Sequence, residues 1–229
     1  MDFENILKYI LELILIAPSV LIALSFHECA HAFVAYKLGD PTAKYMGRLT
    51  LNPVKHFDPI GALCMLLCHF GWAKAVPVNM MNFKNPKRGM ALTALAGPTT
   101  NLILGFIGVS LHAVLMNVLP NSFNNGVIFA LAYALQLLVF YFGYLNIFLA
   151  IFNLIPVPPF DGSRILGAFL SDRLYIKLMG YERIIGIIFF AVYFIDARYS
   201  GPISTGVDTL VGWIYNAFSM PINALFKLF

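Results

Sequence analysis

The chain has 229 residues, of which 60% are hydrophobic and only 11% are charged. A mean hydropathy of +0.79 lies far above the usual range of soluble domains and excludes an ordinary water-soluble globular protein. The net charge of +4 does not indicate nucleic-acid binding, because the fifteen Lys and Arg residues form no basic stripe. The composition predicts a protein that lies in a lipid bilayer.

Long apolar segments predict five, or at most six, transmembrane helices. A helix needs about 20 apolar residues to cross roughly 30 Å of hydrocarbon. Three segments meet this length, and two shorter ones are added to the count: Ile6 to about Tyr36, Met90 to Leu119 and Val127 to Asn153, then Tyr181 to Ile195 and Gly206 to Phe218. The expected fold is an all-α polytopic membrane protein. It forms one membrane-embedded domain over residues 1–229, with a core at 6–170 and additional helices at 181–229.

The region between the first two spans is expected to be less regular. Gly61 to Trp72 is apolar but too short to cross a bilayer, so we expect a half-inserted hairpin helix. Tyr45 to Pro53 and Ala75 to Phe83 hold β-branched and aromatic residues between Gly, Pro and Asn signals. These two segments are expected to form short β-strands at the membrane interface.

The positions of Lys and Arg predict the orientation in the membrane. Basic residues are frequent in the loops 37–55 and 74–88 and in the segment 164–183, whereas the loop 120–126 has no charge. Since short loops rich in Lys and Arg stay on the cytoplasmic side, these three basic segments are expected there.

The segment His27-Glu28-Cys29-Ala30-His31 carries the strongest chemical signal. Residues four apart on a helix lie about 40° from each other, so both imidazoles can reach one ion. Zinc takes nitrogen ligands of this kind, and Glu28 lies close enough to act as a general base. A hydrogen-bonded cluster without metal is the alternative. It is disfavoured because three ionisable groups in one turn of a membrane helix are costly without a function.

A catalytic zinc ion usually has three protein ligands, and the third one is less clear from the residues alone. Asp161 follows Pro156-Val157-Pro158-Pro159, which cannot continue a helix. Asp161 could therefore be a ligand in an unwound segment, or it could cap a helix that starts near Arg164. Both readings are open on this evidence.

Several ordered motifs resemble those of the site-2 protease family of intramembrane zinc metalloproteases, in its short prokaryotic branch without PDZ or CBS domains. Besides the histidine motif, they are the segments 51–61 (LNPVKHFDPIG) and 71–79 (GWAKAVPVN), Ala96-Gly97-Pro98 with Asn101, and the segment 153–162 (NLIPVPPFDG). The chain departs from the usual pattern at Ala75, where Pro is common, and at Phe160, where Leu is usual.

This resemblance implies a zinc-dependent endopeptidase that cleaves transmembrane protein or peptide substrates in the bilayer. It implies one Zn²⁺ per chain held by His27, His31 and Asp161, with Glu28 as the general base. Asn153 would lie near the substrate or the forming oxyanion, although it could simply cap the helix that ends there. The expected location is the cell membrane, with the active site toward the cytoplasmic side.

Other polar residues have plainer interpretations. His56 is as well explained by a hydrogen bond to nearby backbone as by a role near the metal, and Gly97-Pro98 is best explained by close helix packing. Apolar packing is favoured over a second metal site for Cys64, Cys68 and His69. His112 has no assigned partner. An inactive scaffold has no need of Glu28, and a metal transporter predicts more polar residues along the spans than the sequence shows.

Overall fold

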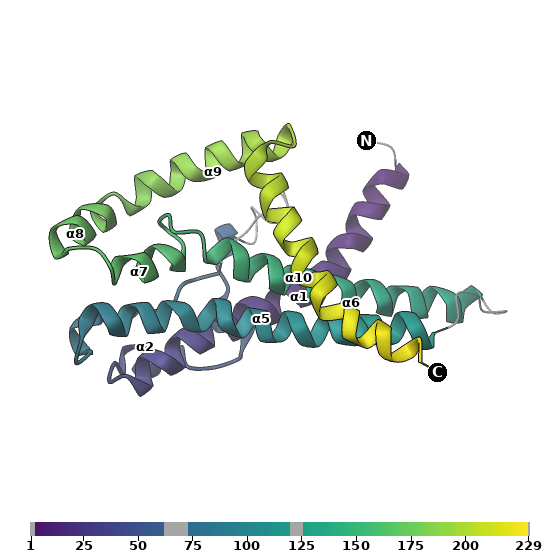
Figure 1. Cartoon of the computed structure of the whole chain (residues 1–229), viewed down its shortest axis with the longest axis horizontal. Coiled ribbons are helices and arrows are strands. Elements are labelled where there is room, and N and C mark those ends of the chain that lie inside the picture. The colour runs from purple at the N-terminus through teal and green to yellow at the C-terminus, as the bar shows by residue number, and fades with distance from the viewer. Residues whose placement is uncertain (1–2, 62–72, 120–125, 229) are drawn as a thin grey trace.

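The computed structural model describes residues 3–61, 73–119 and 126–228, and every regular element it shows there is a helix (Figure 1). The long helices are α1 (Phe3–Lys37), α5 (Pro86–Val118), α6 (Gly126–Asn153), α9 (Glu182–Arg198) and α10 (Pro202–Phe226). The short ones are α2 (Thr42–Tyr45), α3 (Pro53–His56), η1 (Met80–Asn82), α7 (Asp161–Gly167) and α8 (Asp172–Gly180). The all-helical class and the five long helices agree with the prediction.

The described residues contain fewer candidate membrane spans than expected. By length and apolar character, α1 from Ile16, α5 and α6 can cross a bilayer, and a fourth span results if α8 and α9 count as one helix bent by 61°. Five or six spans are therefore not confirmed. The difference lies mainly in α10, which is long enough but carries polar side chains such as Asp208 and Asn216 along its length.

The predicted interfacial strands are not found: the described segments 45–53 and 75–83 contain short helices and irregular backbone. Side chains take the place of a partner strand. Arg48 donates to the Lys74 and Ala75 carbonyls, and the Asn79 amide donates to Asp40 Oδ2 at 2.7 Å. These side chains satisfy backbone groups at both ends of the segment 75–83 that a ladder would otherwise pair. The predicted half-inserted helix, with Cys64, Cys68 and His69, lies almost wholly outside the described residues.

Helices α5 and α6 lie side by side and form the centre of the molecule, and α10 crosses both of them (Figure 1). The core at this crossing consists of Val109, Ile147, Val207 and Val211, all buried. His112, which had no predicted partner, makes a 2.6 Å hydrogen bond between its Nδ1 and the Tyr215 hydroxyl of α10. Its role in the described structure is to join α5 to α10.

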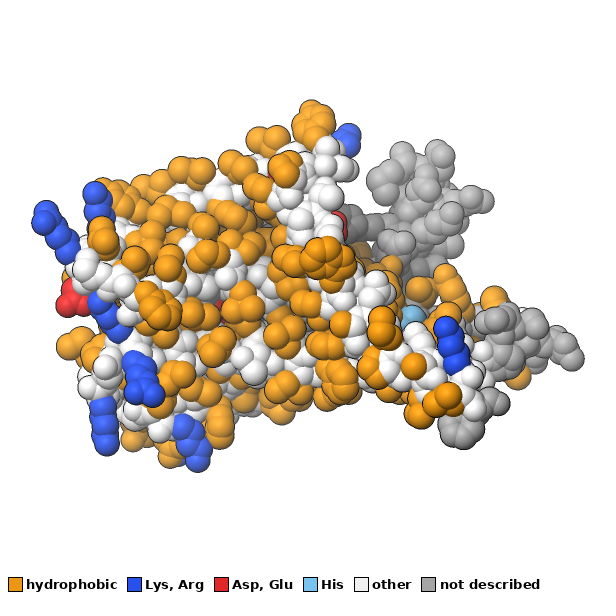
Figure 2. Space-filling view, in the orientation of Figure 1, with side chains coloured by type: hydrophobic (Ala, Val, Ile, Leu, Met, Phe, Trp, Pro, Cys, Tyr) orange, Lys and Arg blue, Asp and Glu red, His pale blue; other side chains and the backbone are white. Residues whose placement is uncertain are grey.

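The outer surface is largely apolar, and the Lys and Arg side chains visible in Figure 2 are concentrated at one end. In the same orientation, that end holds α8, α2 and the start of α5 (Figure 1). Exposed apolar side chains such as Ile103, Phe106, Ile107 and Leu131 cover the sides of α5 and α6. An apolar belt with basic residues at one end is typical of a multi-pass membrane protein.

Candidate metal centre

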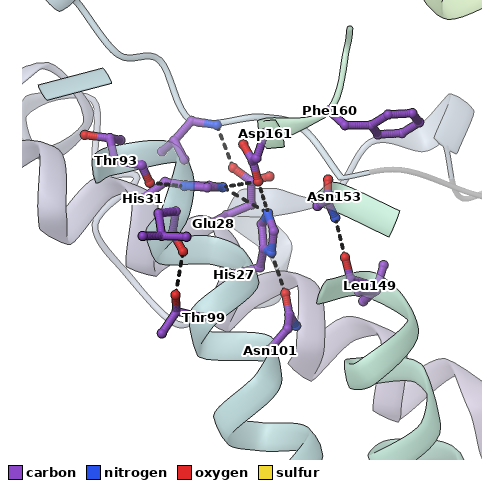
Figure 3. A network of polar contacts seen from close by, with 12 residues as sticks. His27, Glu28, His31, Thr93, Thr99, Asn101, Leu149, Asn153, Phe160 and Asp161 are labelled. Carbon is purple, nitrogen blue, oxygen red and sulfur yellow. Dashed lines mark hydrogen bonds and ion pairs between the residues drawn. The ribbon is translucent and has the colours of Figure 1, made fainter. Parts of the chain in front are cut away.

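The two histidines of the motif lie on the inner face of α1, well before its end at Lys37. His27 and His31 are 5% and 8% exposed, and their Nε2 atoms are 2.9 Å apart. The four-residue spacing therefore brings both imidazoles to one point, as predicted (Figure 3). Cys29, between them, does not belong to this cluster.

Asp161, which is far from the histidines in the sequence, lies at the same point. It is the first residue of α7, and its Oδ2 lies 3.1 Å from His27 Nε2 and 3.2 Å from His31 Nε2. The helix cap is the neighbouring residue Phe160, whose ring packs edge-on against Phe152 at 4.7 Å. Phe160 therefore occupies the cap position that the sequence allowed for Asp161, and Asp161 lies beside the two histidines, where it is a candidate ligand.

The three ligand atoms fit a metal ion. They form a nearly equilateral triangle with edges of 2.9, 3.1 and 3.2 Å. Ligands of a tetrahedral zinc ion with bonds of about 2.0–2.1 Å lie about 3.3–3.4 Å apart, which is close to these values. Three protein ligands would leave one tetrahedral position open, as in catalytic rather than structural sites.

The hydrogen bonds of the histidines also fit metal binding. His27 Nδ1 donates to Asn101 Oδ1, and His31 Nδ1 donates to the Thr93 carbonyl at 2.7 Å (Figure 3). In a neutral imidazole the other nitrogen is then unprotonated, so both Nε2 lone pairs face each other. Asp161 Oδ2 is buried and has no hydrogen-bond donor in the described part of the chain. A metal cation placed between these three electron pairs would stabilise all of them at once.

Glu28 lies beside this centre without being part of the ligand triangle. Its Oε2 accepts a hydrogen bond of 2.8 Å from the backbone amide of Val76, and its side chain lines the same cavity as both histidines. Glu28 is only 8% exposed, and this backbone bond orients its carboxylate near the metal position. A carboxylate in this place can take a proton from a water and return it.

The loop that carries Val76 is tied down by the polar groups that replace the expected strands. The buried Arg48 holds the loop at Lys74 and Ala75, and the Lys74 amide donates to the His56 carbonyl at 2.8 Å. His56 Nε2 in turn donates to the Thr50 carbonyl at 2.8 Å. His56 therefore makes the backbone contact expected from the plainer reading of the sequence.

Asp40 anchors the other end of this loop. Its carboxylate accepts hydrogen bonds from the Asn79 amide and the Asn82 side chain, both at 2.7 Å, and from Thr42. Burial raises the pKa of this carboxyl, but the hydrogen bonds outweigh burial and hold its pKa below the usual range. Asp40 is therefore ionised at neutral pH, which makes these bonds charge-assisted and strong.

A cavity of about 850 Å³ opens over the candidate metal centre. Its walls include the ligands, Glu28, Val76, Asn153 and the charged residues Arg164, Glu182 and Arg183 near α9. Asn153 is the last residue of α6, and its Nδ2 donates to the Leu149 carbonyl at 2.9 Å (Figure 3). A peptide segment could enter a cavity of this size and reach the metal position.

Sequence reasoning missed the groups that hold the ligands. Asn101 was noted only as part of a motif, and Asn146, Thr93 and the Val76 amide were not singled out. The available signal was the presence of Asn101 and Asn146 in apolar helices, where a polar residue is costly and needs a reason. Both asparagines are fully buried.

The fold and the site together define a class: a membrane protein with a cluster of two histidines and an aspartate that could hold a metal ion, an adjacent carboxylate and a cavity. The family comparison agrees with this class. The model of Peptidase family M50 matches residues 15–195, and the chain belongs to this peptidase family.

Curated relatives point in the same direction. "Putative zinc metalloprotease YwhC" of Bacillus subtilis is 42% identical over 77% of this chain and 78% of that protein. "Putative zinc metalloprotease MJ0611" of Methanocaldococcus jannaschii is 30% identical over 77% of this chain and 81% of that protein. "Putative zinc metalloprotease Rip2" of Mycolicibacterium smegmatis is 29% identical over 73% of this chain and 61% of that protein. No solved structure matches the chain.

Proposed function

We propose that the chain is a zinc-dependent intramembrane endopeptidase that cleaves peptide bonds in or near transmembrane segments of membrane proteins. The triangle of His27, His31 and Asp161 carries this proposal, because three buried side chains that can bind a metal ion meet at one point and their spacing suits zinc. The names of the relatives and the peptidase family support the same metal and reaction.

In this mechanism, each polar residue of the cavity has one task. A bound zinc ion supplies Lewis acidity, which activates a water and polarises a peptide carbonyl. Glu28 takes a proton from the attacking water and gives it to the leaving amine, and the Val76 amide keeps its carboxylate in place. Asn153 lines the cavity and is proposed to stabilise the developing oxyanion through its amide group.

The surroundings of the centre support a substrate that comes from the membrane. The histidines lie six to ten residues before the end of α1 at Lys37, and at about 1.5 Å per residue this corresponds to a depth of about 9–15 Å. A helical substrate offers no free carbonyl there, so the segment must unwind locally before it is cleaved. The basic end of the molecule in Figure 2 supports a centre that opens toward the cytoplasm.

The decisive experiment replaces Glu28 by Gln, which keeps the size of the side chain but cannot take the proton. We expect Glu28→Gln to retain one zinc ion per chain and to lose at least about 100-fold in cleavage of a tagged single-span membrane protein that the wild type processes. Zinc is measured by elemental analysis of the purified chain, and cleavage by the size of the tagged product after co-expression.

Asp161→Ala is the matched variant for the ligand set, because it removes a ligand and leaves the base intact. We expect it to lose both zinc and cleavage. Undiminished zinc in Asp161→Ala would remove this residue from the site, and undiminished cleavage by Glu28→Gln would refute its role as the general base.

A further inference from the structure

Asn146 is fully buried on α6, and in the described part of the chain it belongs neither to the candidate metal cluster nor to the lining of the cavity above it. Its Nδ2 donates to the Phe142 carbonyl one turn earlier at 2.8 Å, and its Oδ1 accepts from Asn101 Nδ2 on α5 at 2.8 Å. Asn101 Oδ1 then accepts from His27 Nδ1 on α1. One chain of hydrogen bonds thus runs through three helices and ends at the metal centre.

The donor-to-acceptor direction of this series of hydrogen bonds is fixed at the Phe142 carbonyl. The Phe142 carbonyl can only accept a hydrogen bond, so Asn146 must turn its Nδ2 toward that carbonyl and its Oδ1 toward Asn101. Asn101 must then present Nδ2 to Asn146, and it has a second acceptor in the Ala23 carbonyl at 3.3 Å. Its Oδ1 therefore faces His27, which places the proton of that imidazole on Nδ1.

The consequence reaches the metal position. If the Asn101 amide turned over, its Nδ2 would face His27 Nδ1, and the imidazole proton would move to Nε2. A protonated Nε2 cannot bind a metal ion. His31 needs no such device, because its Nδ1 donates directly to the Thr93 carbonyl, which has one orientation.

We propose that Asn146 is a positioning residue of the metal centre: through Asn101 it sets the orientation of the amide that holds His27 in its metal-binding tautomer. This inference rests on the proposed zinc site at His27, His31 and Asp161. It adds a residue that makes no contact with metal or substrate and that lies more than one side chain away from both.

The test compares two substitutions of Asn146. If Asn146 only fills space, Asn146→Leu should be tolerated better than Asn146→Asp. If it orients Asn101 through its hydrogen bond, which we call the relay role, Asn146→Asp should be tolerated better. Asn146→Leu keeps the volume and suits an apolar helix, but it cannot bond to Asn101. Asn146→Asp in its neutral form reproduces both hydrogen bonds, with its hydroxyl donating to Phe142 and its carbonyl accepting from Asn101. Zinc affinity is measured by competition with a chelator of known affinity, on the purified full chain in detergent.

We expect Asn146→Leu to bind zinc about 10-fold more weakly than the wild type, as for loss of other groups that orient metal ligands, and Asn146→Asp to stay close to the wild type. Asn117→Leu is the matched control. Asn117 also donates to the carbonyl one turn earlier, Ala113, and to an asparagine of another helix, Asn223, but it lies far from the centre along α5. Its replacement should leave zinc affinity unchanged.

Several outcomes would overturn the inference. They are wild-type zinc affinity in Asn146→Leu, weaker binding in Asn146→Asp than in Asn146→Leu, or an equal loss in Asn117→Leu. If Asn146→Leu does not fold, Asn146→Ala, which cannot clash, gives the same comparison.

His31→Ala separates this inference from the proposed function. Zinc bound as tightly by His31→Ala as by the wild type overturns both proposals, because the ion is then held elsewhere. Zinc loss in His31→Ala together with full affinity in Asn146→Leu overturns the relay alone.

Discussion

Helix α5 meets its neighbours in two different ways along its length. In its first half, Gly97 lies against the two histidines: a Cβ atom there would be 2.5 Å from His27 Cε1 and 2.5 Å from His31 Nε2. In its second half, Gly108 lies against the backbone of α6 at Gly143, with a Cβ position 2.7 Å from the Cα atom of that residue. The first glycine makes room for imidazole rings, and the second makes room for another helix.

The two glycines show that a small residue in a membrane helix can have different structural roles. Small residues at helix crossings usually allow close packing of backbones, and that was the expected role of Gly97. The structure gives this role to Gly108 and Gly143, whereas Gly97 forms part of the wall behind the candidate ligands. The two halves should therefore respond differently to the same substitution.

The largest effect is expected for Gly97→Ala. The added methyl group would overlap both imidazoles at 2.5–2.6 Å, so the rings must move away from the metal position. We expect zinc affinity to fall by at least about 10-fold, with cleavage lost in parallel. Chelator competition and cleavage of a tagged membrane protein measure the two effects.

Gly212→Ala on α10 is the control for this change, since a Cβ there would meet no atom of the described residues within 4 Å. It should bind zinc normally. The comparison between the halves of α5 would break if Gly97→Ala bound zinc as tightly as the wild type.

A smaller and different effect is expected for Gly143→Ala. Its Cβ would lie 2.8 Å from the Val109 amide nitrogen and 3.1 Å from the Gly108 carbonyl carbon, and backbone atoms cannot move aside as side chains can. Overpacking of this kind costs about 1–3 kcal/mol, so we expect a lower unfolding temperature in detergent with zinc affinity retained.

Gly126→Ala, at the start of α6, is the matched control, because its Cβ would have no neighbour within 4 Å among the described residues. A loss of zinc affinity in Gly143→Ala at unchanged stability would contradict the assignment of this half to packing.

Much of the fold could be predicted because membrane helices follow from local properties. Apolar length identified α1, α5 and α6, although α5 begins at Pro86, with Asn85 as its cap, and not at the predicted Met90. The interfacial strands were wrong because β-branched residues in 45–53 and 75–83 suggested a ladder. The backbone there is instead satisfied by distant side chains, above all Arg48 and Asp40, which no local pattern reveals.

The candidate site also has a part that local sequence predicts and a part that depends on distant contacts. Four-residue spacing places His27 and His31 together whatever the rest of the fold does, whereas Asp161 is 130 positions farther along and needed the family motif. The groups that orient the ligands depend on still more distant pairs, such as His27 with Asn101 and Asn101 with Asn146. Such contacts arise from the packing of α1, α5 and α6. The sequence alone showed only that these asparagines lie in apolar helices, where burying a polar side chain costs free energy.

The smallest effect is expected at the outer end of α5, where the helix meets the exposed start of α8. Lys87 Nζ lies 2.6 Å from Asp172 Oδ1 and donates to the Leu170 carbonyl at 2.5 Å, which ties the start of α5 to the start of α8. The Asp172 side chain is 84% exposed, so solvent screens the ion pair, and pairs of this kind contribute about 0–1 kcal/mol. We expect Lys87→Gln to change the unfolding temperature in detergent only slightly and to leave zinc affinity unchanged. In 1 M salt, the difference in unfolding temperature between the wild type and the variant should become smaller still. A change as large as that of Gly143→Ala would mean that the contact between α5 and α8 supports the fold as strongly as the buried contact between α5 and α6.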